Sequence, residues 1–359
     1  MKTHSIRLSA STICERRESL DTATMKKKPT LTQWRHAYAL ADRIHALAPW
    51  NTLADCDTFG LRSGKQTRYC CVMGNAGDHY AVMVYNSVLE LSKVSDAVGT
   101  YGDPMDLLSV ACAQVSFESQ DWLDADDLAL MKRIGYQPQA PALWPQFRAR
   151  TDWHHDSLPF ADELTALVDA MDMILAEAPG MSEEWLEATD EIRQDREWYI
   201  YSRDKKAPET WQRTLESIPP VGIHFPVPSF DIGDMAMMPQ DEGVLEIDLN
   251  GMASSIQNGR DGRLMIPMLL TAVDGNSGMA ITHAMATADK DPIAPWLEAP
   301  ELVLKAVFAM KERPKRIIYR HELMAVLLGE VSQQLGITLE QRATLPRTTD
   351  MLAAMNEEM

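Results

Sequence analysis

Several short stretches of the sequence carry residue types that can do chemistry, but each lacks a partner that its reaction needs. The stretch HELMA at 321–325 begins like the HExxH motif of zinc proteases, in which two histidines on one helix face bind the metal. Position 325 is alanine, so the second ligand is absent. No GxGxxG, GxxxxGKS, GxxxxGKT or GxSxG sequence occurs, so phosphate-binding loops and serine-hydrolase elbows are unsupported.

Histidine and cysteine are also poorly arranged for metal or redox chemistry. His154 and His155 are adjacent, and adjacent side chains diverge in an extended chain, so a shared metal is disfavoured. The five cysteines are an odd number, contain no CxxC pair and indicate a reducing, cytoplasmic setting. Cys70 and Cys71 lie in a predicted strand, so we expect one in the core and the other on the surface.

The charge of the chain bears on its partners. The formal net charge is −18, which disfavours non-specific binding of nucleic acid over the whole surface. No apolar run is long enough to predict a membrane span, and no secretory leader is predicted. Residues 1–30 differ, with seven Lys/Arg and three Asp/Glu, so 1–28 is predicted to be a disordered basic tail. Met25 before three lysines is an alternative start, and a partner-binding basic arm is another interpretation.

The elements that would position a site fall into two groups separated by a proline- and methionine-rich linker at 219–240. Residues 29–218 predict an α+β domain in which an antiparallel sheet packs with helices, because β-rich runs alternate with turn sequences and amphipathic stretches. The strands are expected at 58–63, 67–74, 79–86, 107–119 and 143–150, with a hairpin across 197–218. The helices are expected at 32–47, 87–98, 124–134 and 159–178.

Residues 241–359 predict an α/β domain with the order β-β-β-α-β-α-β and a final helix. The strands are expected at 243–249, 263–274, 278–287, 316–320 and 337–342, and the helices at 299–312, 321–335 and from 349. The sequence DGNSG between the second and third strands is a strong hairpin turn. The linker methionines are expected to pad a domain interface rather than to bind copper, because no histidine or cysteine accompanies them.

This order, with the phrases TAVDGNSG and RPKRIIYR, resembles the ribonuclease H-type core of transposases and integrases over residues 243–342. The resemblance implies a fold of that type and a site in which several carboxylates hold two Mg²⁺ ions. The whole chain also resembles uncharacterised two-domain bacterial proteins, domains of unknown function, to which no activity is assigned. That match lies in Pro49–Trp50, Val72–Gly74, Val84–Tyr85, Arg313–Pro314, Glu322–Leu323, Leu335–Ile337 and Leu345–Pro346.

Only part of that catalytic pattern is present. Asp248 stands in the first strand, where the resemblance places the first aspartate, and its other interpretation is an ordinary strand-end residue. Arg320, followed by His321, occupies the position of the second carboxylate, where a cation would repel Mg²⁺. The remaining weak candidates have ordinary structural explanations: two suit the first turn of a helix and one suits a hairpin turn. They are Glu301, Glu322 and Asp274.

We therefore expect a degenerate core without a committed catalytic residue, metal ligand or cofactor. The function predicted from the sequence is non-catalytic binding or assembly with a protein partner in the bacterial cytoplasm. A Mg²⁺-dependent nuclease that uses Asp248 with Glu301 or Glu322 is the first alternative. A small-molecule sensor at the domain interface, near the linker, is the second.

Overall fold

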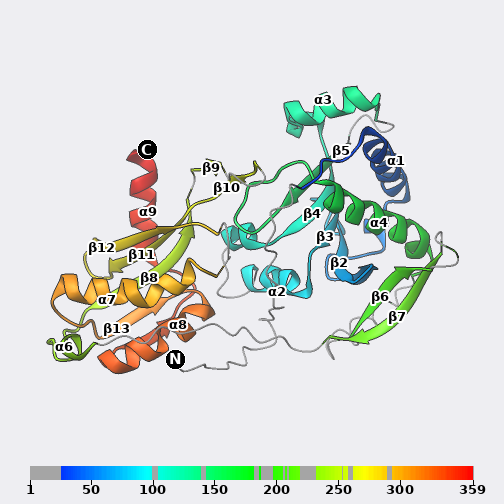
Figure 1. Ribbon diagram of the computed structural model, residues 1–359. Coiled ribbons are helices and arrows are strands. Elements are labelled where there is room, and N and C mark those ends of the chain that lie inside the picture. The colour runs from blue at the N-terminus through cyan, green and yellow to red at the C-terminus, as the bar shows by residue number, and fades with distance from the viewer. Residues whose placement is uncertain are drawn as a thin grey trace.

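The computed structural model describes residues 26–98, 104–138, 143–181, 186, 197–204, 207, 210–218, 232–252, 254–257, 262–288 and 293–358. These residues form two large sheets, each with its own helices, and one two-stranded sheet, and the chain is α+β overall (Figure 1). The tail predicted at 1–28 and the linker predicted at 219–240 lie largely outside the described residues.

The N-terminal sheet has seven strands in the order β5-β4-β3-β2-β1-β6-β7. The strands are β1 (Phe59–Ser63), β2 (Gln66–Met73), β3 (Ala81–Tyr85), β4 (Cys112–Glu118), β5 (Trp144–Arg150), β6 (Glu197–Arg203) and β7 (Trp211–Ser217). The expected antiparallel sheet is in fact mixed, because β6 joins β1 in parallel. Gly60 allows this close approach, since a Cβ there would collide with Ile200.

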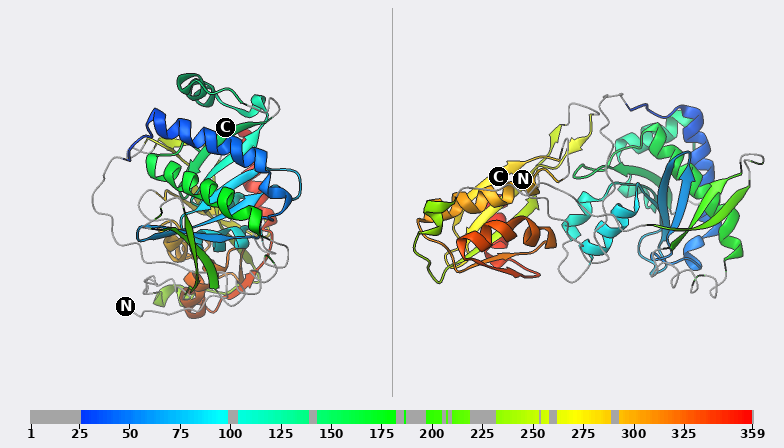
Figure 2. Two further views of the ribbon diagram at one scale, coloured as in Figure 1. Left: turned by 90° about the vertical axis from the view of Figure 1, so that its right-hand side faces the viewer. Right: turned by 60° about the horizontal axis from the view of Figure 1, so that its bottom comes forward.

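Helices cover both faces of this sheet. On one face α1 (Leu31–Leu47) and α4 (Ala161–Glu177) run side by side, with α3 (Ala125–Ile134) nearby (Figure 2). On the other face lies α2 (Val88–Ala97) with the short 3-10 helix η2 (Pro104–Ser109). The prediction that only one of Cys70 and Cys71 is buried is therefore wrong, because each thiol enters a different core.

Local sequence accounts for the ends of the first helix. Thr30 and Gln33 form a capping box at the start of α1, where the Thr30 hydroxyl accepts from the Gln33 N–H and the Gln33 amide oxygen accepts from the Thr30 N–H. Ala48 closes the helix in the left-handed conformation, and the proline that follows begins a new turn. The predicted helix over 32–47 is thus present with clear boundaries.

The strand predicted over 107–119 begins later than expected. Residues 104–109 form η2, and β4 starts only at Cys112. Tertiary packing explains the difference: Leu107 joins a core of the N-terminal domain, whereas Leu108, one residue on, packs against the core of the C-terminal domain. A strand would direct these side chains to opposite faces of one sheet instead.

The C-terminal sheet has five strands in the order β12-β11-β8-β13-β14. The strands are β8 (Val244–Gly251), β11 (Met268–Asp274), β12 (Ala280–Ala286), β13 (Arg316–Tyr319) and β14 (Thr338–Gln341). Strand β11 pairs antiparallel with both β8 and β12, whereas β13 runs parallel to β8 and β14. A two-stranded ribbon, β9 (Ile256–Gln257) and β10 (Leu264–Met265), was not predicted; Pro267 interrupts what the sequence suggested was one long strand.

The two faces of this sheet have different coverings. Helices α7 (Ala299–Met310) and α8 (Glu322–Leu335) pack on the face that carries Leu245, Ile247 and Leu249, and α9 (Pro346–Glu358) lies on the opposite face (Figure 1). Helix α9 begins three residues before the expected position. Buried Glu246 fixes this start, because its carboxylate accepts from both the N–H and the hydroxyl of Thr348.

Part of the expected linker packs against the C-terminal core. Ile232 is buried there, and α6 (Gly233–Ala236) is a single helical turn next to α8. Met235 and Met238 are partly buried against the same core. These methionines therefore serve as packing residues in the described part of the segment.

Candidate functional site

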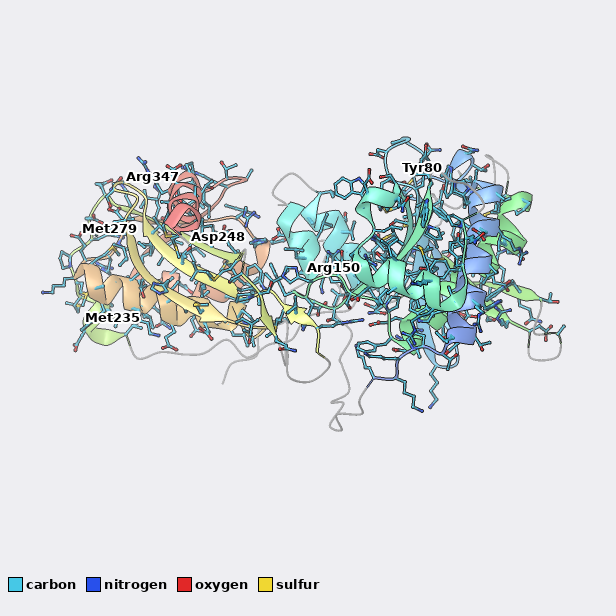
Figure 3. The ribbon with its side chains drawn as sticks, turned by 90° about the horizontal axis from the view of Figure 1, so that it is seen from above. Tyr80, Arg150, Met235, Asp248, Met279 and Arg347 are labelled. Atoms are coloured by element: carbon cyan, nitrogen blue, oxygen red, sulfur yellow. The ribbon has the colours of Figure 1, made fainter. Side chains whose placement is uncertain are left out.

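Asp248 and Arg320 form a buried ion pair at the centre of the C-terminal sheet. Asp248 lies in the second half of β8, and its side chain is on the face opposite Ile247. Tyr319 pairs in register with Ile247, so Arg320 follows at the position next to Asp248. Arg320 Nη2 is 3.1 Å from Asp248 Oδ2, and both side chains are less than one-tenth exposed. Figure 3 shows Asp248 within the sheet of this lobe.

Two polar side chains hold Arg320 in this position. The Asn250 amide oxygen accepts from Arg320 Nη2 at 3.4 Å. From the neighbouring strand β14, the amide of Gln341 donates to the Arg320 carbonyl at 2.9 Å. The guanidinium is therefore fixed between the carboxyl ends of two adjacent parallel strands, β8 and β13.

His321 extends this pair to the N-terminal domain. Its Nε2 is 3.9 Å from Asp248 Oδ1 and 3.5 Å from Oδ1 of Asp106, which lies in η2. The His321 ring packs edge-on against Trp296, with 4.8 Å between the ring centroids. One imidazole thus lies between two carboxylates, one from each domain, beside a guanidinium.

A second buried charge cluster positions η2 and therefore Asp106. Lys93 Nζ donates to the Glu90 carboxylate, to the Ser109 carbonyl at 2.8 Å and to Asp152 Oδ1 at 3.2 Å. Burial raises the pKa of Glu90, because removal from water disfavours the charged carboxylate. The Lys93 ammonium thus links α2, η2 and the turn after β5.

Burial also raises the pKa of Asp248, to about 6, and three contacts oppose the rise. They are the Arg320 charge, the Asn250 side chain and the Leu249 N–H. The unfavourable effect of burial exceeds the favourable effect of the ion pair. Asp248 is consequently a destabilising carboxylate near neutral pH, which is unusual for a residue with an arginine partner.

This imbalance predicts a specific pH dependence of stability. A carboxyl group whose folded pKa is raised stabilises the fold fully below its unfolded pKa, near 3.8, and loses that contribution as the pH rises through about 6. We expect the free energy of unfolding of the wild type, minus that of Asp248→Asn, to fall by about 2 kcal/mol between pH 4 and pH 7. Urea titrations at several pH values measure it. A difference that stays constant with pH would show that Asp248 does not titrate in this range.

The other candidate carboxylates lie apart from this pair. Glu301 is exposed on α7 and forms an i,i+4 ion pair with Lys305. Glu322 is exposed in the first turn of α8. Asp274 accepts from the N–H groups of Asn276 and Ser277 in the β11–β12 turn. Along β11, Asp274 is three residues from Thr271, which pairs in register with Asp248.

Spacing along the strand places Asp274 about 10 Å from the level of Asp248. Among the residues that the structure describes, no group of three or more His, Cys, Asp or Glu side chains is arranged to hold a metal ion. His154 and His155 also separate: His154 Nδ1 contacts the Asp152 carbonyl, whereas His155 Nε2 lies 2.8 Å from the Ser255 hydroxyl.

Sequence reasoning did not identify the residues that join the two domains. Arg263, next to β10, makes two hydrogen bonds to Glu163 of α4, at 3.0 and 2.6 Å, and its guanidinium stacks on Phe160. The Arg263 side chain is 2% exposed. Because Arg263 and Glu163 are 100 residues apart, no local sequence pattern relates them. Only the burial of an arginine in a short ribbon could have indicated the contact.

Trp153 is the apolar counterpart of that contact. It belongs to the N-terminal domain but is buried in the C-terminal core, with its backbone in the left-handed region at a φ of 56°. Its N–H donates to the Leu108 carbonyl, and its carbonyl accepts from the Ile266 N–H at 2.7 Å. A tryptophan rarely adopts this conformation, so the packing must compensate for the strain.

Two family models match the chain, one for each domain. Residues 34–200 match a model described as "Domain of unknown function (DUF7309)". Residues 232–356 match a second, "Domain of unknown function (DUF6930)". No curated protein matches the sequence. None of the helices in the described ranges is long and apolar enough to cross a membrane.

Proposed function

We propose that this chain is a non-catalytic binding or assembly protein of the bacterial cytoplasm whose C-terminal domain is a degenerate ribonuclease H-like core. The sheet order supports this likeness. Three antiparallel strands are followed by two strands that add, through helical crossovers, on the other side of the first. In such a core the carboxyl ends of β8 and β13 would carry the metal-binding acids.

The single observation that carries the proposal is the Asp248–Arg320 pair. Mg²⁺ requires oxygen ligands, and a two-metal mechanism requires several of them around two ions about 4 Å apart. Here one of the two central positions is a guanidinium 3.1 Å from the remaining carboxylate. Its charge occupies the space of a cation and repels a second one. The pair replaces the metal instead of binding it.

The proposed binding role rests on surface properties. A formal charge of −18 suits a partner with basic groups, because opposite potentials speed encounter and select partners. Several large apolar side chains are exposed on the C-terminal domain, where they are available for burial against a partner. They include Ile256, Leu264, Met279 and Met285.

A plasmid-nicking assay with Mg²⁺ or Mn²⁺ tests the proposal that the protein is non-catalytic. We expect no metal-dependent cleavage from the purified full chain and none from Asp248→Asn. Cleavage by the wild type that disappears in Asp248→Asn would establish the nuclease alternative.

The proposal that the protein assembles with a partner is tested by the native size of the tagged chain in cell extract. A complex well above the 40.2 kDa of one chain is expected, and a monomer would contradict it.

A further inference from the structure

In the part of the chain that the structure describes, strand β12 is an edge of the C-terminal sheet with no strand paired on its outer side. It is the last strand in the sheet order, and its sequence, AITHAMA, contains neither a charged residue nor proline. Within the described ranges, the backbone hydrogen bonds of 280–286 join only the partner strand β11. The N–H and C=O groups on the outer edge are therefore available to another strand. Natural sheets usually protect such an edge with charge, proline or a covering element.

An exposed methionine lies at either end of this edge, and a hollow adjoins one of them. Met279 and Met285 are 63% and 59% exposed. Figure 3 shows Met279 on the side of the lobe away from the N-terminal domain. A pocket of about 410 Å³ adjoins Met285 and is lined mainly by apolar residues. The lining includes Ile256, Pro267, Pro295 and one carboxylate, Glu298.

We infer that β12 binds an extended peptide segment of a basic partner protein, which adds as a sixth strand to the sheet. Backbone hydrogen bonds to the outer edge of β12 would supply affinity, as in other cases of strand addition. An apolar side chain of the peptide would enter the pocket beside Met285, and the basic side chains that alternate with it would be attracted by the net negative charge of the chain. This inference rests on the proposed binding function and names its surface and the chemistry of its partner.

Charge decides between this occupant and a second copy of the chain. Self-pairing of β12 would bring together two molecules that each carry a formal charge of −18. Long-range repulsion between them opposes association. A segment with alternating basic and apolar residues meets both features of the site, because its apolar side chains face one side of the strand and its charged ones the other.

Fluorescence anisotropy with a labelled peptide, Lys-Val-Lys-Leu-Lys-Val-Lys, tests the inference on the full chain. Met285→Lys is the test variant, because it places a charge at the pocket beside the edge. Phe308→Lys is the matched control, because Phe308 is 65% exposed on α7 and the change in net charge is identical. We expect Met285→Lys to weaken binding at least tenfold and Phe308→Lys to change it less than twofold.

Two further peptides separate strand addition from general attraction between charges. A version N-methylated at every residue has no backbone N–H to donate along either of its edges, and a version with glutamate in place of lysine reverses the charge. We expect both to bind at least tenfold more weakly than the parent. Equal weakening by Met285→Lys and Phe308→Lys, or full binding of the N-methylated peptide, would overturn the inference. So would sedimentation of the wild type as a dimer that Met285→Lys dissociates, since the occupant would then be a second copy.

The proposed function can be judged apart from this surface. If the tagged chain is found in a large complex in cells and Met285→Lys leaves that complex intact, the binding function stands and the β12 site is wrong. If the wild type is monomeric in cells and nicks DNA with Mg²⁺, the proposed function itself is wrong.

Discussion

Replacing Arg320 by methionine should lower the free energy of unfolding at pH 7 by about 3–5 kcal/mol, as is found when one partner of a buried ion pair is removed. The substitution leaves the Asp248 carboxylate, 3% exposed, without its counterion. Burial already raises the pKa of this group, and loss of the guanidinium raises it further. The loss of stability should therefore diminish below pH 6, where Asp248 becomes protonated. Urea denaturation at pH 5 and pH 7 measures both effects.

Two variants serve as controls for that result. The double variant Asp248→Leu with Arg320→Met removes both charges, and we expect it to recover most of the lost stability. Arg342→Met breaks an exposed pair with Glu340 and should cost less than about 1 kcal/mol. If Arg320→Met proves as mild as Arg342→Met, the buried pair does not determine the stability of this domain.

The second large effect is expected at the contact between domains. Arg263→Met removes both hydrogen bonds to Glu163 and leaves that carboxylate in a buried position, with Lys26 Nζ 3.7 Å from Oε1. We expect a loss of about 3–5 kcal/mol in the stability of the interface. The domains should then unfold in two separate transitions, because their coupling is weakened. Tryptophan fluorescence can follow this, since Trp153 lies in the interface.

Arg263→Lys is the informative comparison. Lysine keeps the positive charge but cannot reproduce the two parallel hydrogen bonds of a guanidinium, nor its stacking on Phe160. An intermediate loss is expected. A single cooperative transition in Arg263→Met, at the wild-type urea concentration, would mean that other contacts hold the domains together.

The sequence predicted most of the regular elements because their signals are local. Thr30 and Gln33 cap α1, Gly336 ends α8 in the left-handed conformation, and the DGNSG sequence forms the β11–β12 turn. The alternation of β8 is also visible in the sequence: Ile247 faces the helices and Asp248 the opposite side. Arg320, at the position where the resemblance places a second carboxylate, forms an ion pair with Asp248.

Contacts between segments far apart in the sequence could not be predicted from such local signals. The parallel pairing of β1 with β6 depends on Gly60 meeting Ile200, and no local rule relates two positions 140 residues apart. The conversion of 104–109 into η2 depends on Leu108 packing in the other domain. The role of Asp106 at His321 and the burial of Cys71 follow from the same long-range packing.

In our proposal, the two domains meet at the position where a ribonuclease H-like enzyme would bind its substrate and metal. Asp106 of the N-terminal domain contacts His321, and His321 lies beside the Asp248–Arg320 pair. We propose that this position now holds the two domains together, and that the partner protein binds instead at the outer edge of the sheet, at β12.

Thermal unfolding of the full chain in increasing Mg²⁺ and Mn²⁺, with Asp248→Asn measured in parallel, tests the central claim most directly. A metal that binds only the folded state, at about 100 times its dissociation constant, would add roughly 2.7 kcal/mol of stability. We predict that the wild type and Asp248→Asn respond identically and weakly to both ions. A clear rise in the wild-type Tm that is absent in Asp248→Asn would show that the site still binds metal, and it would contradict the proposal that Arg320 has replaced it.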